Sequence, residues 1–367
     1  MTTTAEGLIA AAGAPTLTAL LRGNLAASGE YEGTLANHLP MALTALDRMG
    51  ADGDRLAAFA AAYRRRVEMM DLPDHGAEID PQRWRERLGD RSAEGSWRRF
   101  FAAERTRLGR DGMLRTWLPM VTESVAASAF HPIIRLGFAL DALAAAEGPD
   151  AAAVVEAEID ATLAYAAVAH VVLAGAHDPA PAAAGDAADP VAILKDLAGA
   201  PGLGAPFPGD KIIGRMEEVA KRPALAGVID RLIVEDDTLE RLVAAARDLF
   251  AATGNFTALH GLTASHALRR VWAFVPEHDR IPALRRHWQA LVCAWVTIGR
   301  PAPPDAARRS AMARSAPDWP PILAAGRASD DAHVVKSIYA LWREDAIGPD
   351  PLNRYAAARY AKLVIGV

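Results

Sequence analysis

The stretch DRLAAFAAAYRRRVEMM, residues 54–70, carries apolar side chains at Leu56, Phe59, Tyr63 and Val67. Successive members of this set are three or four residues apart, so they lie on one face of an α-helix. No segment of the chain shows the convincing polar and apolar alternation of a strand. The helical spacing recurs at residues 34–46, 96–108, 237–253 and 281–299. The sequence therefore predicts an all-α protein.

Glycine and proline gather in connectors between these helical stretches, at residues 148–150, 177–190, 199–209 and 300–304. The longest connector, within AHDPAPAAAGDAADP, is either a flexible loop or a boundary between two helical halves. We expect the loop at 177–190, because helices bury their faces across such breaks. Residues 1–367 are then predicted to form a single large multi-helix domain.

The composition is that of a folded chain, with 51% hydrophobic and 23% charged residues among 367. Forty Lys and Arg against 45 Asp and Glu give a net charge of −5, which offers no broad basic surface, so we expect no nucleic-acid partner. The single cysteine, Cys293, can form neither an internal disulfide nor a thiolate zinc cage. A bound metal would therefore have nitrogen and oxygen ligands.

The N-terminal residues MTTTAEGLIAAAGAP lack the basic lead and the long apolar run of a secretory signal, so we expect a cytoplasmic protein. The most apolar stretch, residues 161–175, is shorter than the roughly 20 residues of a membrane helix. It also follows Glu156, Glu158 and Asp160. We interpret it as a buried helix and expect no membrane association.

Common catalytic motifs are missing from the sequence. The glycines of Gly202–Gly204 lack the preceding strand and the third glycine of a dinucleotide fingerprint. There is no Walker lysine loop, no HExxH helix and no GxSxG elbow. Histidine is the residue type that remains as a candidate for chemistry.

Ten histidines are present. His75, His177, His278 and His287 lie in polar or loop-like surroundings, and we expect them at the surface. His170 faces the interior by pattern, and we interpret it as a hydrogen-bonded core residue outside any site. The more suggestive settings are those of His38, His131, His260 and His333.

Two of these settings predict where the ring lies relative to a helix. His131 precedes Pro132, which suits the first helical position, so its ring would project from a helix start. Ser329 is a candidate N-cap for the helix of His333. Lys336 is three residues beyond His333, so an imidazole and an amine would leave the same helix face.

Four blocks, NHLPMAL, FHPIIRLGFAL, TALHGLTASHALRRV and DDAHVVKSIYALWR, occur in this order from His38 to Trp342. Together they resemble the questin oxidase-like family, helical oxygenases linked to ring opening of anthraquinones and related aromatic polyketides. The resemblance implies a mononuclear non-haem iron centre held by four histidines and a carboxylated lysine. Transferred by position, the ligands are His38, His131, His260 and His333, with Lys336 as the carbamate.

This ligand set makes chemical sense. Neutral imidazoles bind Fe(II) but leave its charge uncompensated, and a carbamate adds an anionic oxygen. Carbamate formation needs a neutral amine, which burial favours by lowering the lysine pKa. His266 is a rival ligand, but it lies six residues from His260, about 240° around a helix, so we prefer His260.

The resemblance further implies an Fe(II)-dependent oxygenase that uses O2 to cleave a carbon–carbon bond or to insert oxygen beside a carbonyl. Arg135 stands where the family pattern has a histidine, which bears on the substrate more than on the metal. No nicotinamide fingerprint is present, and a dioxygenase needs no NADPH, so that requirement stays open. Candidate pocket residues near the blocks, for which core packing is the alternative role, are Arg135, Trp117, Phe130, Phe138, Phe256, Tyr339 and Trp342.

Two other functions are compatible with the sequence. The four histidines could be ordinary hydrogen-bonded groups in a metal-free helical protein that binds a hydrophobic aromatic compound. The same site could also hold zinc or manganese and catalyse hydrolysis or isomerisation, because imidazole and oxygen ligands do not select iron uniquely. Metal analysis and the oxygen dependence of product formation separate these functions from the oxygenase.

Overall fold

The computed structural model describes residues 16–73, 77–175 and 189–364. Its helices are α1 (Leu17–Asn24), α2 (Leu39–Arg48), α3 (Gly53–Arg66), α4 (Glu94–Glu123), α5 (Ala127–Ala144), α6 (Gly148–Val168), α7 (Pro190–Ala198), α8 (Ile212–Ala220), α9 (Thr238–Thr253), α10 (Phe256–Val271), α11 (Glu277–Thr297), α12 (Ala306–Ser315), α13 (Trp319–Ala328), α14 (Ala332–Ile347) and α15 (Pro351–Tyr360). Short 3₁₀-helices are η2 (Trp84–Arg87), η3 (Arg91–Ala93), η4 (Pro223–Leu225) and η5 (Trp272–Phe274). The predicted all-α class is confirmed.

A small antiparallel sheet accompanies the helices, with strand order β2-β1-β3. Its strands are β1 (Ala27–Tyr31), β2 (Leu35–Ala36) and β3 (Met69–Asp71). The sheet shortens two of the predicted helices, because α2 begins only at Leu39 and α3 ends at Arg66. Val67, predicted on the helical face, adopts an extended backbone instead. Strands this short present too little alternation for the sequence to reveal them.

The predicted amphipathic face of α3 is otherwise confirmed, since Leu56, Phe59 and Tyr63 are buried. The predicted stretch 96–108 lies within α4, 237–253 covers α9 and the residue before it, and 281–299 overlaps α11 but extends two residues beyond its end. The apolar stretch 161–175 is helical only as far as Val168, where α6 ends, although Ala169 and Leu173 beyond it are also buried. In the described part of the chain, no helix has both the length and the apolar character to cross a membrane.

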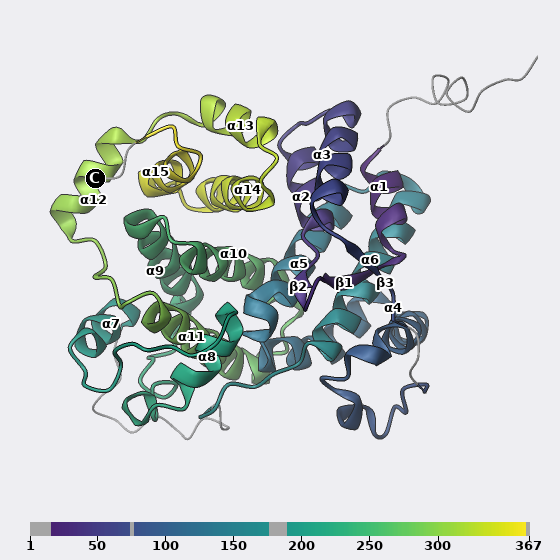
Figure 1. Cartoon of the computed structure of the whole chain (residues 1–367), viewed down its shortest axis with the longest axis horizontal. Coiled ribbons are helices and arrows are strands. Elements are labelled where there is room, and N and C mark those ends of the chain that lie inside the picture. Colours follow the sequence, from purple (N-terminus) through teal and green to yellow (C-terminus); the bar gives the residue numbers. More distant parts are fainter. Residues whose placement is uncertain (1–15, 74–76, 176–188, 365–367) are drawn as a thin grey trace, which may run out of the picture.

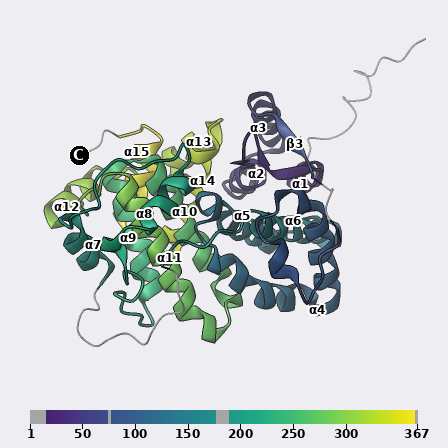
Figure 2. The ribbon, with the colours of Figure 1, turned by 60° about the horizontal axis from the view of Figure 1, so that its bottom comes forward.

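The elements fall into two groups that meet at α5 and α10 (Figures 1 and 2). Helices α1 to α6 and the sheet lie on one side, and α7 to α15 lie on the other. The main hydrophobic core includes residues from Ala36 to Ala358, so both groups contribute to it. A single domain over residues 1–367 stays a prediction. Its connector 177–190 lies outside the described residues except for Asp189, which caps α7, and Pro190.

Four helices far apart in sequence pack in a closed cycle, in which α2 contacts α5, α5 contacts α10, α10 contacts α14, and α14 contacts α2. The approach of α5 and α10 is especially close at Gly137. A Cβ atom there would lie 2.8 Å from the Cα of Ala267, so only glycine fits. This cycle of helices determines where the histidines meet.

Candidate metal centre

Each helix of the cycle contributes one histidine to a closed ring of imidazoles. His38 precedes α2, His131 lies in α5, His260 in α10 and His333 in α14. The ring centroids are 4.7 Å apart for His38 and His131, and 4.7 Å for His38 and His333. They are 4.9 Å apart for His131 and His260, and 5.5 Å for His260 and His333. The structure thus brings together the four histidines that the sequence singled out.

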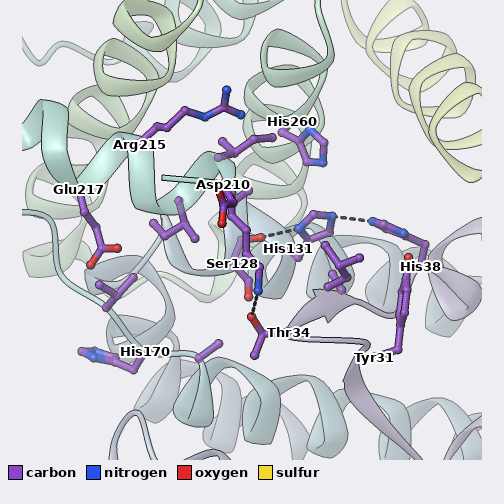
Figure 3. Close-up of a pocket in the computed structure, with 18 of the residues that line it drawn as sticks. Tyr31, Thr34, His38, Ser128, His131, His170, Asp210, Arg215, Glu217 and His260 are labelled. Carbon is purple, nitrogen blue, oxygen red and sulfur yellow. Dashed lines mark hydrogen bonds between the residues drawn. The ribbon is translucent and has the colours of Figure 1, made fainter. Parts of the chain in front are cut away.

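His38 is positioned by the chain that leads into α2. Asn37 accepts a hydrogen bond from the Leu39 amide at 3.0 Å, and Pro40 occupies the first helical turn. The His38 amide donates to the Tyr63 hydroxyl at 2.9 Å. These contacts fix the backbone from which the imidazole projects (Figure 3).

His131 follows a turn of unusual conformation. Ser128, Ala129 and Phe130 have φ values of 45°, 56° and 71°, in the left-handed region that non-glycine residues rarely adopt. The turn brings the Ser128 carbonyl oxygen to the Nδ1–H of His131, which donates to it. The regular right-handed part of α5 follows this turn and begins at His131, immediately before Pro132. The prediction that the His131 ring projects from a helix start is therefore confirmed.

His260 and His333 are oriented in the same manner as His131. The His260 Nδ1–H donates to the carbonyl oxygen of Phe256 at 2.8 Å. The His333 Nδ1 lies 3.3 Å from Asp331, whose carboxylate also accepts the His333 amide at 2.8 Å. Asp331 is therefore the N-cap of α14, and the prediction of Ser329 in that role is wrong because the helix starts two residues later.

This hydrogen bonding leaves nitrogen lone pairs available at the centre of the ring. An oxygen acceptor on Nδ1 fixes the proton there, so Nε2 is unprotonated in a neutral imidazole. Burial lowers the pKa values of His38, His131 and His260 well below 6.5, and neighbouring histidines and Lys336 lower them further. Burial likewise lowers the pKa of His333. At neutral pH the four imidazoles are therefore uncharged, and their nitrogen lone pairs can bind a metal ion.

Three of the four imidazoles lie close enough together that they could hold a metal ion. One potential ligand atom each from His38, His131 and His260 lies within 4.8 Å of the others. The Nε2 of His333 is buried and, among the described residues, has no hydrogen-bond partner. Metal-binding histidines typically donate their second ring N–H to a carbonyl or carboxylate oxygen, as three of these rings do.

Lys336 is completely buried, and its charge lowers the pKa values of all four histidines. Its Nζ has no hydrogen-bond partner within the described ranges. Burial lowers the pKa of Lys336 from 10.5 to about 7, so much of the amine is neutral at neutral pH. A buried amine without a partner is costly unless it is neutral or modified.

The imidazoles form part of the wall of a cavity of about 570 Å³ (Figure 3). Phe256 also lines it, with its ring 4.7 Å from that of His260 and 4.6 Å from that of His333. Further lining residues come from β1, which contributes Tyr31, and from α8, which contributes Arg215. A small organic molecule in this cavity would contact the histidine ring directly.

A sequence profile described as Questin oxidase-like matches residues 35–341. The chain belongs to the questin oxidase-like family. Among curated proteins, none shows significant similarity to the chain. Membership indicates an oxidoreductase, an oxidase or oxygenase of aromatic polyketides.

Of the seven pocket residues predicted from the sequence of this questin oxidase-like protein, Phe256 lines the cavity. Arg135, another of the seven, does not line this cavity. It is 1% exposed, and its guanidinium binds both carboxylate oxygens of Glu158 at 2.6 Å and 2.9 Å. The long side chain reaches from α5 to α6 and joins these two helices, away from the cavity.

The other five predicted pocket residues pack elsewhere. Trp117 donates to Glu104 at 2.9 Å inside an aromatic cluster of α4. Phe138 and Tyr339 pack against each other at 5.4 Å, and Trp342 lies beyond Tyr339. Phe130 packs 6.2 Å from His287. Phe130 and Phe138 belong to α5, Tyr339 and Trp342 to α14, and Trp117 to α4. Their packing contacts correspond to the alternative role stated above, core packing.

The remaining histidines divide between the core, the cavity wall and the surface. His287 is completely buried, with Nε2 2.9 Å from the Ser265 hydroxyl, so its predicted surface position is wrong. His278 is exposed, as predicted. His170 lines the cavity and lies 3.7 Å from Glu123, and so is not a core residue. His75 and His177 lie outside the described residues.

His266 is buried away from the imidazole ring, as its angular offset from His260 predicts. It lies 2.7 Å from Glu344 and 3.8 Å from Asp141. Despite burial, which opposes the charge, hydrogen bonds to these carboxylates raise its pKa above 6.5. Because a protonated imidazole has no lone pair for a metal, this raised pKa disfavours His266 as a ligand.

Sequence reasoning missed several residues of the cavity wall, among them Tyr31, Lys211 and Arg215. Tyr31 belongs to the small sheet, and the other two belong to the start of α8. Neither element lies in a block that resembles the family pattern around a histidine. The only sequence signal for them was that two basic residues, Lys211 and Arg215, follow the glycine- and proline-rich connector at 199–209.

Proposed function

We propose that this protein is a non-haem Fe(II)-dependent oxygenase that acts on an aromatic polyketide such as an anthraquinone, with O2 as co-substrate. The reaction would be oxidative carbon–carbon cleavage or a Baeyer–Villiger-like ring opening. The observation that supports it is the closed ring of four neutral imidazoles in the wall of a 570 Å³ cavity. Family membership supports the reaction class.

The proposed ligands are the imidazoles of His38, His131, His260 and His333, with Lys336 as a carbamate. Bound Fe(II) would supply the activation of O2 that organic side chains cannot perform. The neutral Lys336 amine would react with CO2 to give a carbamate and one proton. The carbamate would then contribute an anionic oxygen to an otherwise uncharged donor set.

The chain itself would orient the ligands and hold the substrate. The carbonyl oxygens of Ser128 and Phe256 and the carboxylate of Asp331 fix three of the rings. The Phe256 side chain, 47% exposed beside the histidines, offers an apolar face to a flat ring. Ile212 adds apolar surface that excludes water from the cavity.

The decisive experiment is metal analysis of protein purified without a tag, followed by an anaerobic and aerobic assay with an anthraquinone. We expect about one iron per chain, substrate loss only with O2, and ¹⁸O from ¹⁸O2 in the product. Assays with and without NADPH show whether a reductant is consumed. Protein that binds the anthraquinone but no metal would be a binding protein, and product formed without O2 would indicate hydrolysis or isomerisation.

A further inference from the structure

Three cationic side chains line the cavity, namely Arg91, Lys211 and Arg215. Arg91 forms an ion pair with Glu30 at 2.8 Å. Lys211 donates hydrogen bonds to the Gly33 carbonyl and the Thr34 hydroxyl. Arg215 differs, because no described residue forms an ion pair or a hydrogen bond with its guanidinium, and its Nε is buried without a partner.

Arg215 is held in a defined position by the start of α8. Gly209, with φ of 119°, packs against the backbone here, and a Cβ at this position would lie 3.1 Å from the Arg215 amide nitrogen. In Figure 3 the Arg215 side chain extends from α8 toward the side of the cavity on which His260 lies. The guanidinium therefore belongs to the same chamber as the imidazole ring.

Two carboxylates also line the cavity, Asp210 and Glu217. Neither lies within ion-pair distance of Arg215. Glu217 is two residues further along α8, so it leaves the helix on nearly the opposite side, and in Figure 3 its carboxylate points away from the guanidinium. Asp210 is on the exposed loop before the helix. The Arg215 fork is thus free to bind an anionic group of a ligand.

We propose that Arg215 determines substrate specificity by binding a negatively charged oxygen, a carboxylate or an ionised phenol, on the aromatic substrate. This inference rests on the proposed function for the aromatic nature of the substrate. A guanidinium binds a carboxylate through two parallel hydrogen bonds, which fixes the orientation of the attached ring as well as its affinity. The ring would thereby face the histidines in one orientation.

The test compares the binding of two probes of nearly equal shape, anthraquinone-2-carboxylate and the neutral anthraquinone-2-carboxamide. Titration calorimetry under anaerobic conditions measures binding without turnover. We expect the wild-type protein to bind the carboxylate at least ~10-fold more tightly, as for a hydrogen bond to a charged group. Arg215→Gln should abolish this preference while leaving the affinity for the carboxamide unchanged, and Arg215→Lys should retain part of it.

The matched control is Lys221→Gln, which removes the same charge from the exposed end of α8. It should keep the wild-type preference. Equal affinities of the wild-type protein for both probes, no binding of the carboxylate, or a preference that survives in Arg215→Gln would overturn the assignment. Iron content and O2 uptake measured on the same preparations test the proposed function separately, because probe binding requires neither.

Discussion

The Nε2 atoms of His38 and His131 lie 2.7 Å apart, although 93 residues separate these histidines in the sequence. The Ser128 carbonyl oxygen accepts a hydrogen bond from the Nδ1–H of His131, so the Nε2 of His131 presents a lone pair to His38. Two protonated rings at this distance would repel each other, and both are buried. The folded state therefore depends on the neutral form of the imidazole cluster.

This dependence predicts acid sensitivity. The folded-state pKa values of His38, His131 and His260 are depressed by burial, so the unfolded chain binds more protons than the folded chain below pH 6.5. Their contribution to stability is present above pH 6.5 and is lost as the pH falls. Between pH 7 and 5.5, we expect the unfolding free energy of metal-free His260→Gln to fall by about 1 kcal/mol less than that of the metal-free wild type, because one titrating site is gone. Urea unfolding at both pH values measures this difference.

His266 provides a control of opposite sign. Its folded-state pKa is raised by hydrogen bonds to carboxylates, so its contribution is present below pH 6.5 and is lost as the pH rises through the folded pKa. His266→Gln should therefore steepen the loss of stability in acid. The same pH response in both variants would contradict the assignment of neutral and charged imidazoles.

Replacement of one imidazole should release the metal while the fold persists. His333 lies at the first turn of α14, and its Nε2 has no partner among the described residues. We predict that His333→Ala lowers the bound iron by at least ~10-fold. The far-UV circular dichroism spectrum should not change. His278→Ala, which removes an exposed imidazole, is the control and should keep its iron. Wild-type iron content in His333→Ala would show that this ring is no ligand.

The sequence predicted the helices because their apolar spacing is local information. The sheet was missed because β2 pairs with β1 through only two residues, Leu35 and Ala36. The histidines were selected through a family resemblance, and their convergence depends on helix packing that no local pattern encodes. Arg135 likewise shows that closeness in sequence does not determine where a side chain ends. It lies one turn after His131, yet the length of its side chain takes the guanidinium to Glu158 on another helix.

The left-handed turn before His131 predicts an unusual response to glycine. Ala129 has φ of 56°, a conformation that costs an L-residue roughly 1–2 kcal/mol and costs glycine almost nothing. Ala139, equally buried but in the right-handed part of α5, is the matched control. We expect Ala129→Gly to be less destabilising than Ala139→Gly by about 1 kcal/mol or more. Equal losses in thermal unfolding would mean that the turn is not strained.

The buried Lys336 amine destabilises the fold and is also the proposed carbamate ligand. One substitution should therefore change stability and metal binding in opposite directions. Burial lowers its pKa to about 7, below the unfolded value of 10.5, so the unfolded chain binds more protons between these limits. The penalty for the buried amine is therefore largest below pH 7 and disappears above pH 10.5.

Lys336→Met fills similar volume without the charge, and in metal-free protein at pH 7 it should raise the unfolding free energy by about 2 kcal/mol or more. If the carbamate is a ligand, the same variant should lose at least ~10-fold of its iron and its activity. Wild-type protein supplied with ¹³C-bicarbonate should show a carbamate signal that Lys336→Met lacks. The exposed Lys195→Met is the control for both measurements. If Lys336→Met is more stable than the wild type and keeps its full iron content, Lys336 is a buried amine and the carbamate assignment is refuted.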